Sequence, residues 1–273
     1  MLNLVKLFMQ YQTILKKMKT ELNDEVQYYL DVENDFLNLN QLINRNIEIS
    51  FEGYQCLSCG LEKKIFRQGF CYDCFYNSAQ VGDWIMKPEL SKAHLGIEDR
   101  DLAYEKQVQL KPHIVYLALS SNVKVGVTRK TQVPTRWIDQ GATKAIEIVE
   151  VPNRYLAGIT EVALKEYVAD KTSWQKMLKN NILEADLFEE REKLKKYIPE
   201  EAKEYFLENN GKITEINYPV LQYPTKIKSL NLEKNHVYSG KLKGVKGQYL
   251  MFEDGTVFNV RNSEGLKVII SIE

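Results

Sequence analysis

Residues 113–151 read HIVYLALSSNVKVGVTRKTQVPTRWIDQGATKAIEIVEV, and three runs within this stretch are rich in apolar and β-branched side chains. The first two runs, 113–119 and 123–128, flank a Ser-Ser-Asn turn and predict a β-hairpin. Pro134 suits the first turn of a helix that covers TRWIDQGA. The third run, 145–151, predicts another strand. The stretch therefore has the order strand, strand, helix, strand.

A second helix is expected directly after this stretch. Pro152-Asn153 ends the third predicted strand, and residues 156–168 then carry apolar side chains at helical spacing. Strands and helices that alternate in this way predict an α+β fold.

Further β structure is expected at both ends of the chain. The patterns at 26–32 and 47–51 predict strands with one buried face, and LMF and VFNV flank an Asp254-Gly255 turn, as a hairpin requires. We expect the two terminal β segments to join into one barrel. The charged run at 184–208 predicts a helix that serves as a solvated face or spacer.

The composition excludes several classes of protein. The chain has 273 residues, 44% of them hydrophobic, and 37 Lys and Arg balance 37 Asp and Glu. These values exclude a disordered chain, a collagen and a disulfide-stapled miniprotein. A formal net charge of zero gives no global field that would attract polyanions, so a nucleic-acid contact must use a local patch.

No stretch of the sequence approaches a membrane span, and the N-terminal segment fits a signal peptide poorly. We therefore expect a cytoplasmic protein that does not contact the membrane. The sequence leaves the oligomeric state open.

Four cysteines form two Cys-x-x-Cys pairs, in which two-residue gaps let each pair aim two thiolates at one ion. Four thiolates complete a closed tetrahedral site, so we expect a structural zinc ion in a ribbon that performs no chemistry itself. An iron–sulfur site or a redox dithiol remains an alternative. The predicted ligands are Cys56, Cys59, Cys71 and Cys74.

Basic and aromatic residues alternate on this ribbon. Lys63, Lys64 and Arg67 lie among Phe66, Phe70 and Tyr72. Such a surface can hold a phosphate backbone and stack a base. The alternative is that the aromatic side chains pack on a neighbouring domain.

Short motifs in the central segment resemble the GIY-YIG nuclease superfamily. Residues 114–116 (IVY) and 124–126 (KVG) resemble its two signature tripeptides. Arg136 and Glu161 fall where that superfamily places its catalytic arginine and its metal-binding glutamate, and Trp174 corresponds to a later tryptophan. Ile and Lys replace the first Gly and the second Tyr of the signature. The resemblance implies a three-stranded antiparallel sheet flanked by helices.

A longer resemblance covers nearly the whole chain. KVGVTR, PTRWIDQGA, VPNRYLAGITE, DKTSW and GQYLMFEDGTVFNVR, together with the ribbon, resemble an uncharacterised bacterial family described only as a domain of unknown function. The two resemblances and the composition divide the chain into an N-terminal β segment (1–52), a zinc ribbon (53–80), a connector (81–112), a GIY-YIG-like domain (113–180), a helical spacer (181–215) and a C-terminal β module (216–273).

The nuclease resemblance implies metal-dependent cleavage of nucleic acid. Glu161 would hold Mg²⁺ or Mn²⁺, Tyr116 would orient or deprotonate the water, and Arg136 would clamp the phosphate. Lys124 would lower the pKa of Tyr116 or contact the phosphate. Arg129 and Lys130 flank the same surface and are candidates for nucleic-acid contacts, although solvent-exposed side chains without a role are the alternative.

Two other classes of function stay open. The first is a non-catalytic nucleic-acid-binding protein on a degenerate nuclease fold, in which the Lys-rich C-terminal module and Tyr249 and Phe252 contact bases. The second is a protein-interaction or assembly factor. No P-loop, GxGxxG, GxSxG or HExxH motif supports another enzyme class.

Overall fold

We describe residues 9–33, 35–168, 173–208 and 212–273 in a computed structural model of the chain. Contacts between residues divide it into two compact units, Met1–Tyr76 with Asn217–Glu273, and Asn77–Ile216. The expectations for the extreme N-terminus and for residues 170–172 of DKTSW fall outside the described residues.

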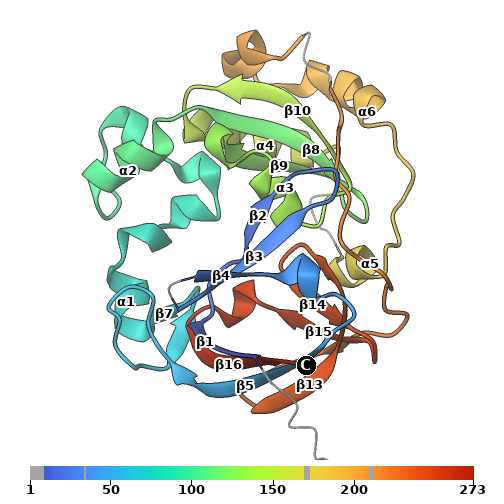
Figure 1. The fold of residues 1–273 in the computed structure, drawn as a ribbon. Helices are drawn as coiled ribbons and strands as arrows, with labels where there is room; N and C mark the ends of the chain where they lie inside the picture. Colours follow the sequence, from blue (N-terminus) through green and yellow to red (C-terminus); the bar gives the residue numbers. More distant parts are fainter. Residues whose placement is uncertain (1–8, 34, 169–172, 209–211) are drawn as a thin grey trace, which may run out of the picture. The chain divides into compact units, whose positions relative to one another are not determined.

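The first unit is built on a sheet that joins both ends of the chain. Strand β5 (Asn46–Tyr54) pairs with β13 (Val237–Lys246) on one side and with β16 (Leu266–Ile272) on the other. β1 (Met9–Ile14) pairs with β16 at the edge. Figure 1 shows the blue N-terminal β5 between the red and orange C-terminal strands. The two terminal β segments were expected to join, and the strand pairing that this requires is present.

The seven strands of this sheet follow the order β1-β16-β5-β13-β14-β15-β12, and the hairpin predicted at the C-terminus is part of it. β14 (Tyr249–Phe252) and β15 (Thr256–Asn259) pair antiparallel across the Asp-Gly turn. Gly255 has φ +83°, and a Cβ there would lie 2.3 Å from the carbonyl oxygen of Lys226, so only glycine fits this turn.

The other elements of this unit are β2 (Lys19–Glu21), β3 (Gln27–Val32), β4 (Asp35–Asn38), the 3₁₀ helix η1 (Leu39–Leu42), β6 (Ile65–Arg67), β7 (Phe70–Cys71), β12 (Lys228–Ser229) and η9 (Arg261–Ser263), with α1 (Tyr72–Asn77) at its boundary.

The second unit contains an antiparallel sheet with the order β11-β10-β8-β9. β8 (His113–Leu119), β9 (Val123–Arg129) and β10 (Lys144–Val151) match the three predicted strands to within one residue. The short β11 (Thr214–Glu215) adds a fourth strand at the edge of β10, which the sequence pattern did not reveal. The mixed strands and helices of both units confirm an α+β protein.

Helices follow the strands as expected. α3 (Thr135–Asp139) lies between β9 and β10, and α4 (Arg154–Lys165) follows β10. The side chain of Asn153 accepts a hydrogen bond from the N–H of Leu156 and caps α4, which begins and ends slightly earlier than predicted. The remaining helices are α2 (Leu102–Gln109), α5 (Trp174–Leu178), α6 (Leu187–Leu194) and the 3₁₀ turns η2 (Ala79–Val81), η3 (Asp83–Ile85), η4 (Pro88–Leu90), η5 (Ala93–Leu95), η6 (Lys130–Gln132), η7 (Lys195–Tyr197) and η8 (Glu200–Tyr205).

The charged run at 184–208 was expected to form a solvated face or spacer, but part of it is buried. Leu187 and Leu194 of α6 belong to the same buried cluster as Leu117 of β8. Arg191 is fully buried and donates to the carbonyl oxygens of Glu147 and Leu207. The run is therefore part of the core of the second unit, because Leu187 and Leu194 lie on the buried face of a short helix.

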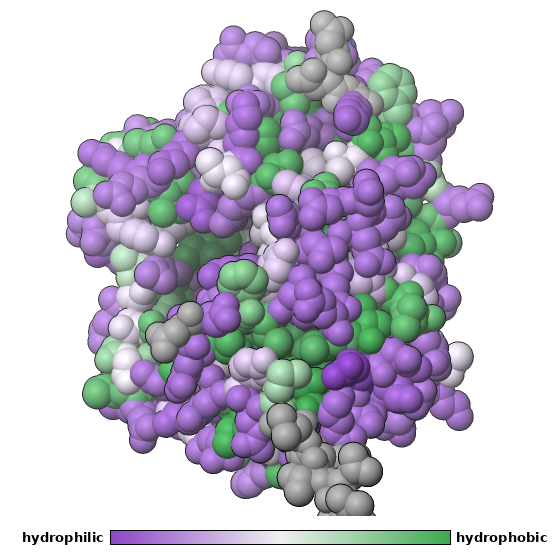
Figure 2. All heavy atoms as spheres, viewed as in Figure 1, coloured by the Kyte–Doolittle hydropathy of each residue, from purple (hydrophilic) through white to green (hydrophobic). Residues whose placement is uncertain are grey.

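Hydrophilic side chains cover most of the face that Figure 2 shows, with smaller apolar areas between them. Among the described residues, no helix is both long enough and apolar enough to span a bilayer.

Candidate functional site

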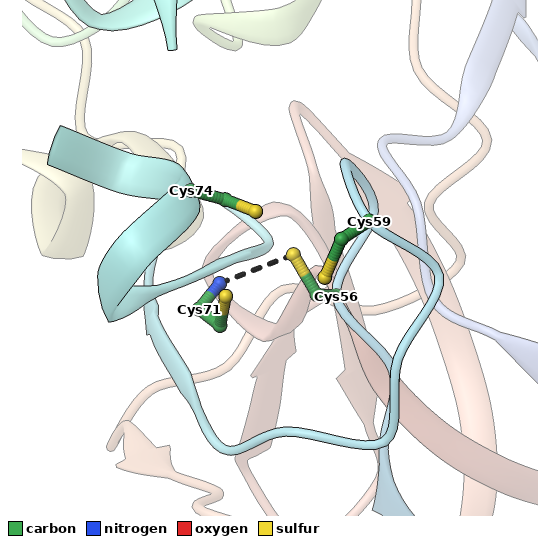
Figure 3. Close-up of side chains that lie close together, drawn as sticks. All are labelled: Cys56, Cys59, Cys71 and Cys74. Carbon is green, nitrogen blue, oxygen red and sulfur yellow. Dashed lines mark hydrogen bonds between the residues drawn. The ribbon is translucent and has the colours of Figure 1, made fainter. Parts of the chain in front are cut away.

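The four cysteines meet at one point in the first unit. Cys56 and Cys59 lie in the loop after β5, Cys71 ends β7, and Cys74 lies on α1. Figure 3 shows their sulfur atoms directed toward one another, and all four lie within 4.8 Å of each other. Tetrahedral coordination with bonds of about 2.3 Å places sulfur atoms about 3.8 Å apart. The four cysteines can therefore bind a metal such as zinc.

The backbone around Cys56 favours a thiolate. Gly60 has φ +71° and donates its N–H to the carbonyl oxygen of Cys56, which closes the first knuckle. The N–H of Cys71 donates to the sulfur of Cys56 at 3.3 Å. Burial opposes ionisation, but hydrogen bonds from backbone N–H groups lower the pKa of Cys56 to about 6. A metal requires this deprotonated form.

The basic residues predicted to contact nucleic acid have different surroundings. Lys63 pairs with Asp73 at 3.0 Å and Lys130 with Glu150 at 2.8 Å. Arg129 is half-buried, whereas Lys64 and Arg67 are exposed. The charges of Lys63 and Lys130 are therefore partly balanced within the protein.

A second group of functional candidates lies in the second unit, on one face of the hairpin β8–β9. Residues that alternate along β9 divide between two faces. Val123, Val125 and Val127 pack on the apolar core, so Lys124 lies on the opposite face. In the register of the hairpin, Tyr116 is opposite Gly126.

Tyr116 is enclosed completely. Its hydroxyl donates to Oε1 of Gln140 at 3.1 Å, and its ring contacts Trp137 edge-on. A Cβ on Gly126 would lie 2.6 Å from this hydroxyl, so the ring fills the space that the glycine leaves. Burial raises the pKa of Tyr116 to about 12, although the charge of Arg136 acts to lower it. The phenol is thus protonated at neutral pH, which differs from the lowered pKa expected of a general base.

Lys124 is also buried, and two charged groups act on it. Burial and the charge of Arg136 lower the pKa of Lys124 to about 8, and Glu161 acts to raise it. Arg136 and Glu161 act on Tyr116 as well. The structure therefore brings Tyr116, Lys124, Arg136 and Glu161 within electrostatic reach of one another, although they come from β8, β9, α3 and α4.

Glu161 is buried on α4, and burial raises the pKa of its carboxyl group. Lys165, one turn later, acts in the opposite direction, and its Nζ lies 3.3 Å from Oε1 of Glu161. Among the described residues, the only cluster of three or more potential metal ligands is the four-cysteine group. A divalent cation at Glu161 would bind a carboxylate oxygen, the ligand type that Mg²⁺ prefers, and the charge of Glu89 also acts on Glu161.

A tight contact fixes the position of α4. A Cβ on Gly158 would lie 2.2 Å from the backbone nitrogen of Glu89, so the turn η4 packs directly on the helix. Arg154 donates to the carbonyl oxygens of Trp84 and Ile85 at 3.0 and 2.8 Å. The connector predicted at 81–112 thus holds the helix that carries Glu161.

Several residues near this group escaped the sequence analysis. Gln140 lies in the PTRWIDQGA string but was given no role there, and Lys165 lies outside the quoted strings. Their contacts with Tyr116 and Glu161 reveal them. His113, the first residue of β8, is fully buried, with Nδ1 2.7 Å from the carbonyl oxygen of Lys111. Trp174 begins α5 and is 37% exposed.

Comparison with known proteins identifies one family. A family model described as a protein of unknown function (DUF2797) matches residues 44–268. No curated protein matches the chain. No solved structure matches it.

Proposed function

Because the chain belongs to the DUF2797 family, whose function is unknown, we propose from its own side chains that it is a metal-dependent nucleic-acid phosphodiesterase of the GIY-YIG type, with a structural zinc ribbon. The observation that carries this proposal is the electrostatic coupling of Tyr116, Lys124, Arg136 and Glu161. Each of these residue types has a place in phosphodiester hydrolysis, and their positions in the sequence resemble those of the nuclease superfamily.

Each residue has a role that follows from its chemistry. Arg136 is half-buried, and its forked donors suit two oxygens of the scissile phosphate. Lys124 has a pKa of about 8 and is largely protonated at neutral pH, so it stabilises charge that develops on the phosphate. Tyr116, with a pKa of about 12, stays protonated, so it would orient the water or phosphate as a hydrogen-bond donor once its hydroxyl leaves Gln140, and would not act as a free base.

Glu161 is the residue that would hold Mg²⁺ or Mn²⁺. The cation supplies Lewis acidity at the phosphate and lowers the pKa of bound water. Lys165 occupies one oxygen of the carboxylate in this structure, so metal binding competes with that ion pair. Activity should therefore rise with metal concentration until the ion pair is displaced.

Zinc is the metal we propose for the four cysteines. Their sulfur atoms lie within the span that a tetrahedral Zn²⁺ site needs. Because four protein ligands leave no open position, this ion stabilises the ribbon and takes no part in hydrolysis. In a reducing compartment thiols do not pair as disulfides, so four clustered cysteines stay available to a metal.

A second candidate function is a non-catalytic nucleic-acid-binding protein. Two observations favour it. Tyr116 is completely buried, and the Glu161 carboxylate is paired with Lys165. In that case Lys124 and Arg136 would contact a phosphate backbone, and no bond would be cleaved.

A cleavage assay tests the proposal. The purified full-length chain is incubated with single-stranded, duplex and branched DNA and RNA, in the presence of Mg²⁺, Mn²⁺ or neither. Glu161→Gln removes the anionic ligand, and Glu166→Gln is the matched control, since Glu166 is exposed at the end of the same helix.

We expect metal-dependent products from the wild type and from Glu166→Gln, and at least a hundredfold lower rate from Glu161→Gln. If no protein cleaves any substrate but all bind nucleic acid with a steep dependence on salt, the non-catalytic function replaces the nuclease. If Glu161→Gln cleaves as fast as the wild type, the assignment of the site is wrong.

A further inference from the structure

The surface of the cysteine ribbon carries an exposed group of aromatic rings. Phe66 of β6 and Tyr72 and Tyr76 of α1 are 40%, 60% and 52% exposed, and we call these three residues the aromatic patch. Phe66 lies 5.2 Å from Tyr72 and 5.8 Å from Tyr76, and the two tyrosines are 4.7 Å apart, between ring centroids. Large aromatic side chains that stay exposed in contact with one another mark an interaction surface.

Two cations accompany the aromatic patch. The guanidinium of Arg67 lies over the ring of Phe66, 5.3 Å from its centroid. Lys64 is exposed, and no ion pair among the described residues includes Lys64 or Arg67. The patch therefore combines stacking surfaces with two available positive charges.

The Lys-rich C-terminal module is less suited to binding nucleic acid than the sequence suggested. Lys228, Lys243 and Lys267 are paired with carboxylates, and Lys246 is fully buried. Phe252 is 3% exposed, so its ring cannot stack a base. The ribbon is thus the better candidate for binding a polyanion in the first unit.

A polar cleft lies beside the aromatic patch. Its volume is about 270 Å³, and Phe66 and Arg67 form part of its wall. The rest of the lining includes four amide residues, Gln68, Asn231, Asn259 and Asn262, and two carboxylates, Glu233 and Glu264. Amides donate and accept hydrogen bonds, as the edges of nucleobases do.

The turn that contributes Gln68 and Gly69 to the lining of this cleft has an unusual backbone. Gln68 and Gly69 join β6 to β7 with φ +52° and +75°. A non-glycine residue in the left-handed region is disfavoured, and Asn or Gly is usual at this position of a two-residue hairpin turn. Gln68 therefore occupies a position where glycine would suit the backbone better, and its side chain lines the cleft.

We propose that the aromatic patch and the polar cleft bind unpaired nucleotides of a single-stranded nucleic acid. One base stacks on the exposed rings, Arg67 and Lys64 neutralise neighbouring phosphates, and the amides contact the edge of a base in the cleft. A duplex keeps its bases stacked within the helix and cannot use these rings. This inference deepens the proposed function, on which it rests, by naming the class of substrate.

The test measures binding of fluorescein-labelled 12-nucleotide single strands and of the corresponding duplex by anisotropy. DNA and RNA versions are separate arms. All proteins carry Glu161→Gln, so that the substrate stays intact. The test variants are Tyr72→Ala and Gln68→Gly, because the first removes an exposed ring and the second removes the amide while relieving the backbone. Phe36→Ala is the matched control, since Phe36 is a 60% exposed aromatic residue on β4.

We expect single strands of DNA, RNA or both to bind at least tenfold more tightly than duplex. Loss of one stacked ring costs about 1–3 kcal/mol, so Tyr72→Ala should weaken binding about fivefold to 150-fold. Gln68→Gly should weaken binding about threefold or more, and Phe36→Ala should not change it.

Other results overturn the inference. The single-strand site is ruled out if duplex and single strands bind with equal affinity, or if Tyr72→Ala leaves binding unchanged. This holds even if the wild type still cleaves nucleic acid. The nuclease assignment fails separately if binding follows the expected pattern but the wild type cleaves nothing. If the protein neither binds nor cleaves nucleic acid, both fail, and the aromatic patch becomes a candidate surface for a protein partner.

Discussion

Gly126 is the position where one methyl group should disturb the candidate site most directly. In Gly126→Ala the new Cβ would lie 2.6, 2.7 and 3.1 Å from Oη, Cζ and Cε2 of Tyr116. Carbon atoms in contact are normally about 3.5–4.0 Å apart. The ring would therefore have to move by nearly 1 Å, but it is fully buried between Trp137 and Gln140.

The magnitude follows from two opposing effects. Overpacking a dense core costs about 1–3 kcal/mol. Alanine stabilises a strand by about 0.5–1 kcal/mol relative to glycine, because it restricts the unfolded chain. We therefore expect Gly126→Ala to lower the free energy of unfolding by about 1–2 kcal/mol.

Urea denaturation of the full-length chain, followed by tryptophan fluorescence, measures this change. A double-mutant cycle with Tyr116→Leu identifies its cause, because a side chain without the ring leaves room for the new methyl group. Gly126→Ala should cost less in the Tyr116→Leu background than in the wild type. A neutral or stabilising Gly126→Ala, or strictly additive effects, would refute the packing of Tyr116 on Gly126.

Three further changes should have measurable effects. Cys71→Ser should abolish binding of one zinc ion per chain, as measured by elemental analysis of the purified protein, whereas a retained equivalent would contradict the four-cysteine site. Burial lowers the pKa of His113 from 6.5 to about 4, so the unfolded chain binds more protons between these values. The free energy of unfolding should then fall as the pH drops from 6.5 to 4, by at most about 1.4 kcal/mol per pH unit from this group, and His113→Gln should show a shallower dependence in denaturation curves. Arg191→Met should cost about 3 kcal/mol or more, because the carbonyl oxygens of Glu147 and Leu207 lose their buried donor, and a change below 1 kcal/mol would argue against that role.

The local pattern of the sequence was sufficient for the strands of the central sheet. Alternating and continuous apolar runs located β8, β9 and β10 because these strands are long and bounded by turn residues. β11 has only two residues, so it carries no periodicity that could reveal it. The Cys-x-x-Cys spacing likewise predicted four neighbouring sulfur atoms, since ligand geometry is encoded locally.

Burial was harder to predict than secondary structure. Arg191 and His113 are polar residues that a sequence pattern places at the surface, yet both are fully buried. The position of Arg191 depends on carbonyl oxygens 44 and 16 residues away, and that of His113 depends on the packing of neighbouring elements. The contact of Gln140 with Tyr116 and that of Lys165 with Glu161 also depend on tertiary structure. No motif records such contacts.

The most direct test of the proposed function is the single-turnover rate of phosphodiester cleavage, measured with saturating enzyme on a nucleic acid that the protein binds. The rate is compared for the wild type, Glu161→Gln and Glu166→Gln in Mg²⁺ at equal occupancy of the substrate. The proposed nuclease predicts products from the wild type and from Glu166→Gln, and a rate at least a hundredfold lower for Glu161→Gln with unchanged binding. Bound substrate that stays intact with the wild type would contradict it.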